Sequence, residues 1–473
     1  MSSGTNSLRC AALMVAIAAA AACSPDSPAS ITDASDPEVP VTNVAGIPNS
    51  QAVAALDAVE SANTQAVNAA PDLVPPGAPL APFVESRLFA ITNVAIHDAL
   101  NAIVPRFERY ADTGPIMREA SVATAVLTAA RDAIVGADPA AEQGTNAWYA
   151  AEISSHTSEA GYAEGVALGH RVALAILTRR AADGTAGGGV APYTPGTSAG
   201  DYQFTFPFNT PGFDFFGTGG FADASMWGAT VTPFVVETAS QFRAPRPYGA
   251  VSNSAAVLTA QYTSDYNEVK AIGCAQCAAR TQAQTEIALF WVENSPEGWN
   301  RIARTVASQR QLDAWDTARL LALLQMGEFD SYATSLESKY YYDFWRPVSA
   351  VALAETDGNP NTSTIANWEV LAFPSPPVPD YPSAHASAGG TAASIIEHLI
   401  PGRGPAITTT SVSLPGVSRT FESVGAAARE NALSRIYVGF HFRHAVNAGI
   451  QQGREVGDYV ASTALRPINS NHD

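Results

Sequence analysis

The stretch Lys339-Tyr-Tyr-Tyr-Asp-Phe-Trp-Arg-Pro347 follows a long run of helical periodicity and sets two cations seven positions apart. Two shorter stretches come later in the chain, Pro382-Ser-Ala-His385 and Ser434-Arg-Ile-Tyr-Val-Gly-Phe-His441. The whole chain has only 26 Lys and Arg and 8 His, so these stretches concentrate its basic side chains. Arginine offers paired planar donors to a tetrahedral oxyanion, lysine adds a point charge, and histidine moves protons or bonds the central atom. The pattern predicts a pocket for a compact, multiply charged oxyanion.

Helix geometry then makes three local predictions. A seven-residue offset is about two turns of helix, so we expect Lys339 and Arg346 to face one pocket. Arg435 and His441 are six residues apart and would not share a helix face, so we expect Gly439 to break the helix and let both converge. A helix is expected to begin at Ser383, whose hydroxyl would cap that helix or bond the oxyanion, while the Ala384 amide favours anions.

The rest of the chain predicts an all-α fold, a large helical bundle with long Gly- and Pro-rich loops. Residues 51–320 form an N-terminal helical part and residues 321–465 a C-terminal part that carries the oxyanion site, packed as one unit. Residues 182–235 read as a long loop that helps to wall the site. Apolar residues recur at helical spacing over the following ranges: 50–70, 85–103, 118–136, 145–180, 254–272, 280–295, 299–309, 312–340, 382–398, 421–437 and 441–463.

The three basic stretches, in this order, resemble the signature shared by vanadium-dependent haloperoxidases and type 2 phosphatidic acid phosphatases. The surrounding residues, such as Pro376-Pro-Val-Pro-Asp-Tyr-Pro382, resemble the haloperoxidase branch. Asp265-Tyr-Asn-Glu-Val-Lys270 and Trp299-Asn-Arg-Ile-Ala-Arg304 are similar to bacterial members. The resemblance covers roughly residues 80–465 and implies the same all-α bundle.

The resemblance implies a vanadate cofactor with His441 as the ligand of the metal and His385 as the acid–base residue. The residues implied to hold vanadate are Lys339, Arg346, Ser383, Ala384, Arg435 and His441. Hydrogen peroxide would then oxidise a halide to a hypohalous equivalent that halogenates a small organic acceptor. Leu336 and Val378 correspond to positions that flank the halide region, and their aliphatic side chains put chloride oxidation in doubt and leave the choice of halide open, with bromide expected before chloride.

An exported acid phosphatase is the alternative that the resemblance leaves open, with His441 phosphorylated and His385 protonating the leaving alcohol. The family often has Asp where this chain has Ala445, and that Asp can orient the nucleophilic histidine in phosphatases. Its absence weakens the phosphatase interpretation and requires another group to orient His441. His444 and His97 are interpreted as residues outside the chemistry.

The formal net charge of −18 argues against nucleic acid as a partner. Residues 1–22 have the outline of a secretory signal, and Ala20-Ala-Ala-Cys23 resembles a lipoprotein cleavage box. We therefore expect an exported protein, periplasmic or at the cell surface, with a lipid anchor on Cys23 and a flexible tether over 23–50. Plain secretion and an uncleaved anchor are the alternatives, and a homodimer is an open possibility for assembly.

Cys274 and Cys277 form a Cys-Ala-Gln-Cys sequence. In an exported protein this pattern favours a local disulfide that pins one loop. A redox pair of free thiols and half of a zinc site are the alternatives.

Overall fold

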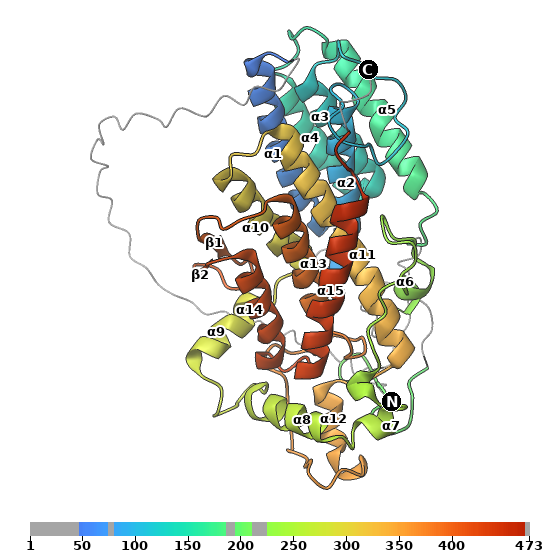
Figure 1. Cartoon of the computed structure of the whole chain (residues 1–473), viewed down its shortest axis with the longest axis vertical. Coiled ribbons are helices and arrows are strands. Elements are labelled where there is room, and N and C mark those ends of the chain that lie inside the picture. The colour runs from blue at the N-terminus through green and yellow to red at the C-terminus, as the bar shows by residue number, and fades with distance from the viewer. Residues whose placement is uncertain (1–46, 74–79, 186–193, 211–224, 469–473) are drawn as a thin grey trace, which may run out of the picture. The chain divides into compact units, whose positions relative to one another are not determined.

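The computed structural model describes residues 47–73, 80–185, 194–210 and 225–468 (Figure 1). These residues are mostly helical, with one two-stranded sheet, so the predicted all-α class is confirmed. All of them belong to one compact unit, Val41–Asp473. The predicted signal and most of the tether lie outside the described residues, and the end of that tether, Asn49 and Ser50, already belongs to the first helix.

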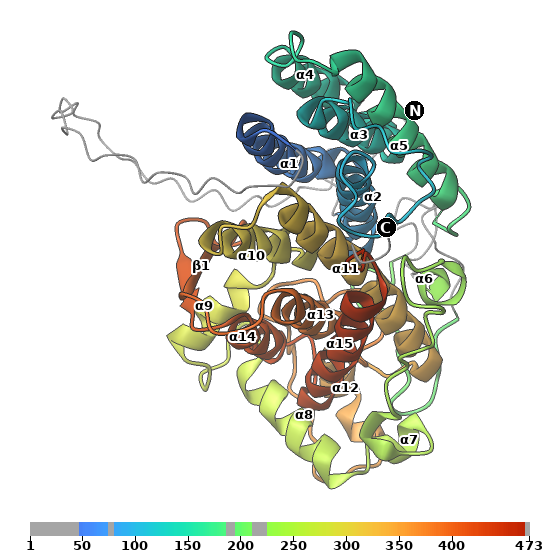
Figure 2. The same cartoon turned by 45° about the horizontal axis from the view of Figure 1, so that its top comes forward.

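The N-terminal helices lie together in both views (Figures 1 and 2) and pack around α3. Ser121 caps α3 by accepting a hydrogen bond from the Thr124 amide. The prediction of one helix over 145–180 was wrong. The chain turns between α4 and α5 and passes through Gly161, whose φ of 78° favours glycine. The helices are α1 (Asn49–Ala69), α2 (Pro82–Asn101), α3 (Val122–Ala137), α4 (Glu142–Ile153) and α5 (Tyr162–Arg180).

The remaining helices include the long α11, which packs against α2, α13 and α15. The predicted helical range 254–272 is divided into α7 and α8, and the short α6 and α12 were not predicted. Their bounds are α6 (Ser225–Thr230), α7 (Asn253–Ala256), α8 (Ala260–Ile272), α9 (Gln282–Phe290), α10 (Ser295–Gln309), α11 (Ala314–Tyr342), α12 (Pro347–Leu353), α13 (Ala384–Leu399), α14 (Val424–Tyr437) and α15 (Arg443–Thr463). Short 3-10 turns occupy Ala70–Leu73, Pro139–Ala141, Pro247–Gly249 and Ala354–Thr356.

Sequence reasoning also missed a β-hairpin in the loop before α14. Strands β1 (Ile407–Thr410) and β2 (Ser418–Phe421) pair antiparallel, with Ile407 opposite Phe421. Both of these apolar side chains are buried. In β1 the side chains alternate between buried and exposed, so that Thr408 and Thr410 are exposed and Thr409 is buried. Four-residue strands are too short for their alternation to stand out in a Thr- and Ser-rich segment.

Helices α13 and α15 lie side by side in both views because small residues let their backbones approach closely (Figures 1 and 2). Gly449, Gly453 and Gly457 recur every fourth residue along one face of α15. A Cβ at Gly453 would overlap the Ser387 carbonyl of α13. This contact fixes the position of α13, whose first residues enter the site described below.

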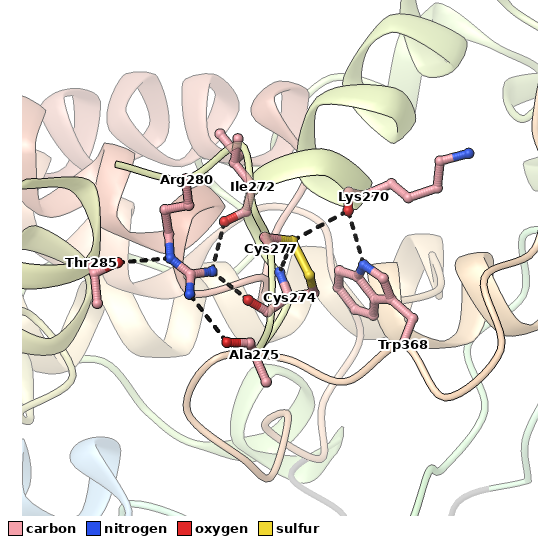
Figure 3. Close-up of a disulfide and its surroundings, with 8 residues drawn as sticks. All are labelled: Lys270, Ile272, Cys274, Ala275, Cys277, Arg280, Thr285 and Trp368. Atoms are coloured by element: carbon pink, nitrogen blue, oxygen red, sulfur yellow. Dashed lines mark hydrogen bonds between the residues drawn. A yellow bond between two sulfur atoms is a disulfide. The ribbon is translucent and has the colours of Figure 1, made fainter. Parts of the chain in front are cut away.

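The predicted disulfide is confirmed, with Cys274 and Cys277 bonded to each other (Figure 3). The Arg280 guanidinium donates to the backbone carbonyls of Ile272 and Cys274, which ties the same loop to the start of α9. Gly273, at the start of this loop, lies against Gly439, where a Cβ would overlap the Gly273 carbonyl. The disulfide loop therefore braces the turn after α14.

No helix among the described residues is long and apolar enough to cross a membrane.

The close approach of α13 and α15 predicts that Gly453→Ala destabilises the protein. The added methyl group must displace the Ser387 carbonyl, and overpacking of this kind costs about 1–3 kcal/mol. Urea unfolding followed by circular dichroism measures the loss. Gly144→Ala in α4 is the matched control, because the added Cβ has no atom within 4 Å apart from its chain neighbours and the backbone of its own helix. Equal stability of the two variants would contradict the packing argument.

Candidate oxyanion site

Three separate parts of the chain bring basic side chains to one cavity of about 380 Å³. The first part is the end of α11 and the residues after it, the second is the start of α13, and the third is the end of α14 with the turn after it. The structure brings six of the predicted site residues to the wall of this cavity, namely Lys339, Arg346, Ala384, His385, Arg435 and His441. Leu336 and Val378 also line it, as does Phe208 from the long loop that was expected to wall the site.

Lys339 and Arg346 reach the cavity, but the reason given for their convergence was wrong. They do not lie on one helix, because α11 ends at Tyr342 and Asp343 takes the left-handed conformation with φ of 54°. Arg346 is instead the residue before α12. The chain reversal at Asp343, closed by a hydrogen bond of 2.7 Å from its amide to the Lys339 carbonyl, brings both cations to the cavity.

Backbone carbonyls hold these two cations in place. The Lys339 ammonium donates to the carbonyls of Pro379 and Asp380 at 2.7 and 2.9 Å. Arg346 donates from Nε to the Val378 carbonyl at 2.7 Å and from Nη1 to a carbonyl in the turn after α14 at 2.9 Å. These hydrogen bonds therefore fix the position of the segment that leads to α13. Because a carbonyl carries no net charge, they leave the positive charges of Lys339 and Arg346 largely uncompensated.

Arg435 completes a set of three buried cations. Its Nη1 donates to the Trp291 carbonyl at 2.7 Å, and its guanidinium lies 5.0 Å from the Phe440 ring centroid. Its Nε is buried and has no hydrogen-bond partner among the described residues. A buried donor without a partner is costly, so this nitrogen is available for a ligand.

Burial and mutual repulsion destabilise the charged forms of these three side chains. Lys339, Arg346 and Arg435 have only 0, 2 and 4% of their surface exposed. Burial, followed by repulsion from Arg346, places the pKa of Lys339 well below its usual value and lowers the pKa of Arg435 to about 9. Burial also lowers the pKa of Arg346. A bound anion would relieve both effects, so the electrostatics favour anion binding.

His441 is held with one ring nitrogen directed to a carboxylate and the other free to accept. Nδ1 lies 2.8 Å from Asp380 Oδ1, and Nε2 lies 3.0 Å from an Arg346 nitrogen. Because arginine can only donate, Nε2 is the acceptor and Nδ1 donates to Asp380. Burial, then repulsion from Arg346 and the other cations, places the pKa of His441 well below its usual value. The ring is therefore neutral, and its Nε2 lone pair accepts from Arg346 in this structure, so a metal centre would have to take the place of that hydrogen bond.

The helix break predicted at Gly439 is confirmed. Helix α14 ends at Tyr437, and Gly439 takes a φ of 88°. The Arg435 carbonyl accepts from the amides of Phe440 and His441 at 3.0 and 3.2 Å, which closes the turn. This turn brings Arg435 and His441 to the same cavity although they are six residues apart.

Asp380 is the residue that sequence reasoning missed. It lies in the Pro-rich approach to α13, and it supplies the orienting group that the absence of an acid at Ala445 had left open. Burial raises the pKa of Asp380 to about 7, against the lowering effect of Arg346 and Lys339. The sequence offered one signal for Asp380. It is a single acidic residue in a Pro-rich segment that also contains two predicted site residues, Val378 and Ser383.

The start of α13 also matches expectation in part. Ser383 is the N-cap residue, and its hydroxyl accepts from the Ala386 amide at 3.4 Å, so the capping interpretation is confirmed. Ser383 is fully buried and is not among the residues that line the cavity. Ala384 and His385 line it directly, and the first amides of α13 have no acceptor within the helix. Burial, then Arg435, lowers the pKa of His385 well below its usual value, so this ring is also neutral.

The two histidines interpreted as bystanders lie elsewhere. His444 accepts from the Tyr248 amide at 2.9 Å and stacks on the rings of Tyr248 and Tyr381. His97 is fully buried beside Asp98, with 2.9 Å between Nδ1 and the carboxylate. Neither residue lines the oxyanion cavity.

Comparison with known proteins identifies similar chains. Residues 319–470 match the family model described as the second helical-bundle domain of VCPO. Vanadium chloroperoxidase of Curvularia inaequalis is 28% identical over 284 residues, which cover 46% of this chain. The match spans 45% of that protein, less than half of its length.

Two solved structures share the fold. A bacterial vanadium-dependent iodoperoxidase superposes with a TM-score of 0.69 at 20% identity, covering 89% of this chain and 98% of the other. The holo form of a bacterial vanadium-dependent chloroperoxidase superposes with a TM-score of 0.64 at 17% identity, covering 83% and 94%. At these identities the likeness establishes the fold.

The site geometry predicts that Arg435→Ala weakens the binding of a tetrahedral oxyanion. Losing charged hydrogen bonds worth about 1.5–3 kcal/mol lowers affinity roughly tenfold to a hundredfold. Calorimetric titration with orthovanadate, and separately with phosphate, measures the change. Arg443→Ala is the control, because Arg443 pairs with Glu268 away from the cavity. Unchanged affinity in Arg435→Ala would show that Arg435 does not contact the anion.

Proposed function

Because the chain carries the second helical-bundle domain of the vanadium chloroperoxidase family and has the fold of bacterial vanadium-dependent haloperoxidases, we propose that it is a vanadium-dependent haloperoxidase. It uses hydrogen peroxide to oxidise a halide to a hypohalous equivalent, which halogenates a small organic acceptor. The observation that supports this proposal most is the set of three buried cations beside a neutral His441.

The residues of the cavity fit vanadate as a cofactor. Lys339, Arg346 and Arg435 provide positive charge, and the unpartnered Arg435 Nε provides a buried donor without a protein acceptor. Nε2 of His441 is the ligand atom that would bond the metal centre, in place of the hydrogen bond that it accepts from Arg346. Ala384 contributes the anion-favouring end of α13, while Ser383 holds that end in place.

Vanadate, when bound, would supply a Lewis acid for the activation of peroxide without a change of oxidation state. Lys339, Arg346 and Arg435 would hold the anion and offset its charge. Asp380 holds the proton of His441 on Nδ1, which keeps Nε2 directed to the centre. His385 is neutral and lines the cavity, so it can accept a proton from peroxide and return it to a leaving oxygen. The apolar wall, including Leu336 and Val378, limits water around these groups.

The halide is proposed to be bromide in preference to chloride. Leu336 and Val378 present aliphatic side chains to the cavity at the two positions that flank the halide region, although aromatic rings such as Phe208 and Phe440 line other parts of its wall. Iodide is a third candidate, since one similar structure is a vanadium-dependent iodoperoxidase. The acceptor is a small organic molecule that fits the remaining apolar space.

A phosphatase is the second candidate, and one observation favours it. The lack of an acid at position 445 argued against a phosphorylated His441, but Asp380 orients that ring from another part of the chain. The same cavity suits phosphate, whose shape is close to that of vanadate. The two functions differ in whether vanadate activates or inhibits the protein.

We also propose export to the periplasm or cell surface, with a lipid anchor on Cys23. The Cys274–Cys277 disulfide supports this proposal, because disulfides persist in oxidising compartments.

The haloperoxidase proposal predicts bromination of a diketone dye by the protein with peroxide and bromide. Orthovanadate titrated into the apo protein should activate it with saturation, and His441→Ala should abolish the activation because the donor nitrogen is lost. Activity is read from the absorbance of the dye. His444→Ala is the control, since His444 lies outside the cavity. Phosphate ester hydrolysis inhibited by vanadate, with no bromination, would instead establish the phosphatase.

The pairing of Asp380 with His441 predicts that Asp380→Asn lowers vanadate affinity by about 10- to 100-fold, as loss of an orienting partner does. An amide can present a donor to Nδ1 and select the wrong tautomer. Titration of orthovanadate against dye bromination measures the affinity. Glu268→Gln, which removes a carboxylate from the pair with Arg443, should leave it unchanged. Equal effects of the two substitutions would rule out a specific role of Asp380.

A further inference from the structure

One face of α11 carries polar groups from the oxyanion cavity into the core of the bundle. Gln325, Glu328, Tyr332, Leu336 and Lys339 are spaced by three or four residues, so their side chains share this face. Lys339, Leu336 and Tyr332 line the cavity. Glu328 lies one turn further from it, is 0% exposed, and has no hydrogen-bond partner for either carboxyl oxygen among the described residues.

Other buried polar groups lie around Glu328 and share this property. The Tyr332 hydroxyl, the Ser295 hydroxyl and one carboxyl oxygen of Glu85 have no hydrogen-bond partner among the residues that the structure describes. They are close enough to act on one another: burial, then Glu328 and Glu85, raise the pKa of Tyr332, and the Ser295 side chain lowers it. Buried polar groups without protein partners are usually satisfied by internal water. We name this set, Glu85, Ser295, Glu328 and Tyr332, the polar chamber.

The polar chamber touches a pocket at each end. Tyr332 lines the oxyanion cavity, where the charge of Arg435 acts on it. Glu85 lines a second pocket of about 380 Å³, whose wall includes the exposed residues Asn68 and Val412. Leu80 and Asn294 line both pockets, so the two pockets are neighbours, and the chamber lies beside them between the protein surface and the site.

We propose that Glu85, Glu328 and Tyr332 form a proton path that carries protons from the surface pocket to the oxyanion cavity. This inference rests on the proposed haloperoxidase function, since it assigns a supply of one reactant to that site. Glu328 is the proton donor within the chamber, Glu85 replenishes it, and Tyr332 with internal water connects it to the cavity.

The reaction requires such a supply, because each halide oxidised consumes one proton: halide, hydrogen peroxide and a proton give hypohalous acid and water. The O–O bond of peroxide breaks and an oxygen–halogen bond forms. The halide loses two electrons to the peroxide, and the proton goes to the oxygen that leaves as water. After donation Glu328 is a carboxylate, and a proton from solvent restores it by way of Glu85.

The protonation of the chamber agrees with this role. Burial raises the pKa of Glu328 to about 8. Burial, then Glu297 and further acids, raises the pKa of Glu85 well above its usual value. Glu328 therefore holds its proton at neutral pH, and the upward shift favours the protonated form of Glu85 as well. The pKa of Glu85 is influenced by the charges of three neighbouring acids, Glu293, Glu297 and Glu328. The pKa of Tyr332 is influenced by the charges of Glu85, Glu328 and Arg435.

The test compares Glu328→Gln, Glu85→Gln and the conservative Glu328→Asp with Glu164→Gln. The control removes an exposed carboxylate from α5, far from the chamber in sequence and outside both pockets. Bromide oxidation by the vanadate-loaded protein gives a pH profile of kcat and KM. Infrared difference spectra of the same proteins follow the carboxylic acid band as the pH rises through about 8.

We expect Glu328→Gln to lower kcat at least about tenfold near pH 8, with a smaller loss at acidic pH, where solvent protons are abundant. Glu85→Gln should act in the same direction, and Glu328→Asp should restore part of the rate. The KM for bromide and the affinity for orthovanadate should stay within about twofold of the original values. The infrared band that titrates near pH 8 should be lost in Glu328→Gln and kept in Glu164→Gln.

An unchanged pH profile or an unchanged infrared band in Glu328→Gln would overturn the proton path. A loss of vanadate affinity in Glu328→Gln would also overturn it, because Glu328 would then act through the structure of the site. If the unaltered protein oxidises no halide with vanadate present, the proposed function itself fails, which is a distinct result.

Discussion

The structure around the cavity depends on the burial of three cations, Lys339, Arg346 and Arg435, close to one carboxylate, Asp380. Removing a charge from water costs several kcal/mol, and Asp380 can balance at most one of the three. Backbone carbonyls take the donors of Lys339 and Arg346 instead. The segments that provide these carbonyls must therefore keep their shapes, and the helices that meet at the cavity must end where they do.

The tight packing behind the cavity serves the same constraint. Glycines on α15 admit α13 closely enough to fix its first turn, and the disulfide loop braces the turn at Gly439. Small residues and a covalent bond thus hold loops that carry uncompensated charge. The rigidity of the site comes from its surroundings, because the cations repel one another.

Sequence alone predicted the parts of the structure that depend on local pattern. Most long helices, the cap at Ser383 and the break at Gly439 follow from periodicity, capping preference and the need for positive φ. The basic stretches predicted six of the residues that line the cavity, whereas Ser383, which was also predicted to belong to the site, is buried outside its wall. The sequence predicted that Lys339 and Arg346 face one pocket, but it gave the wrong reason. They converge through a chain reversal at Asp343, which takes a left-handed conformation although it is not a glycine, so the sequence contained no signal for the turn.

The residues that sequence reasoning missed are those whose importance depends on burial and on partners far away in the chain. Asp380 is one acid among many until the fold places it 2.8 Å from His441. Glu328 sits in an ordinary helical sequence, and only the packing of α2, α10 and α11 removes its carboxyl group from solvent. Their pKa values are raised by tertiary burial, which spacing along one helix does not reveal.

The wall of the oxyanion cavity also bears on how long the protein would survive its own product. Among the residues that line it, Phe, Pro, Leu and Val predominate, and none is methionine or cysteine. Sulfur side chains are among the first to be oxidised by strong oxidants. Met326 lies within the hydrophobic core on α11, and Cys274 and Cys277 are already joined in a disulfide. In the proposed function, a hypohalous product would thus meet no sulfur side chain among the residues that line the cavity, and the groups there that it could halogenate are Tyr332, Lys339 and the two histidines.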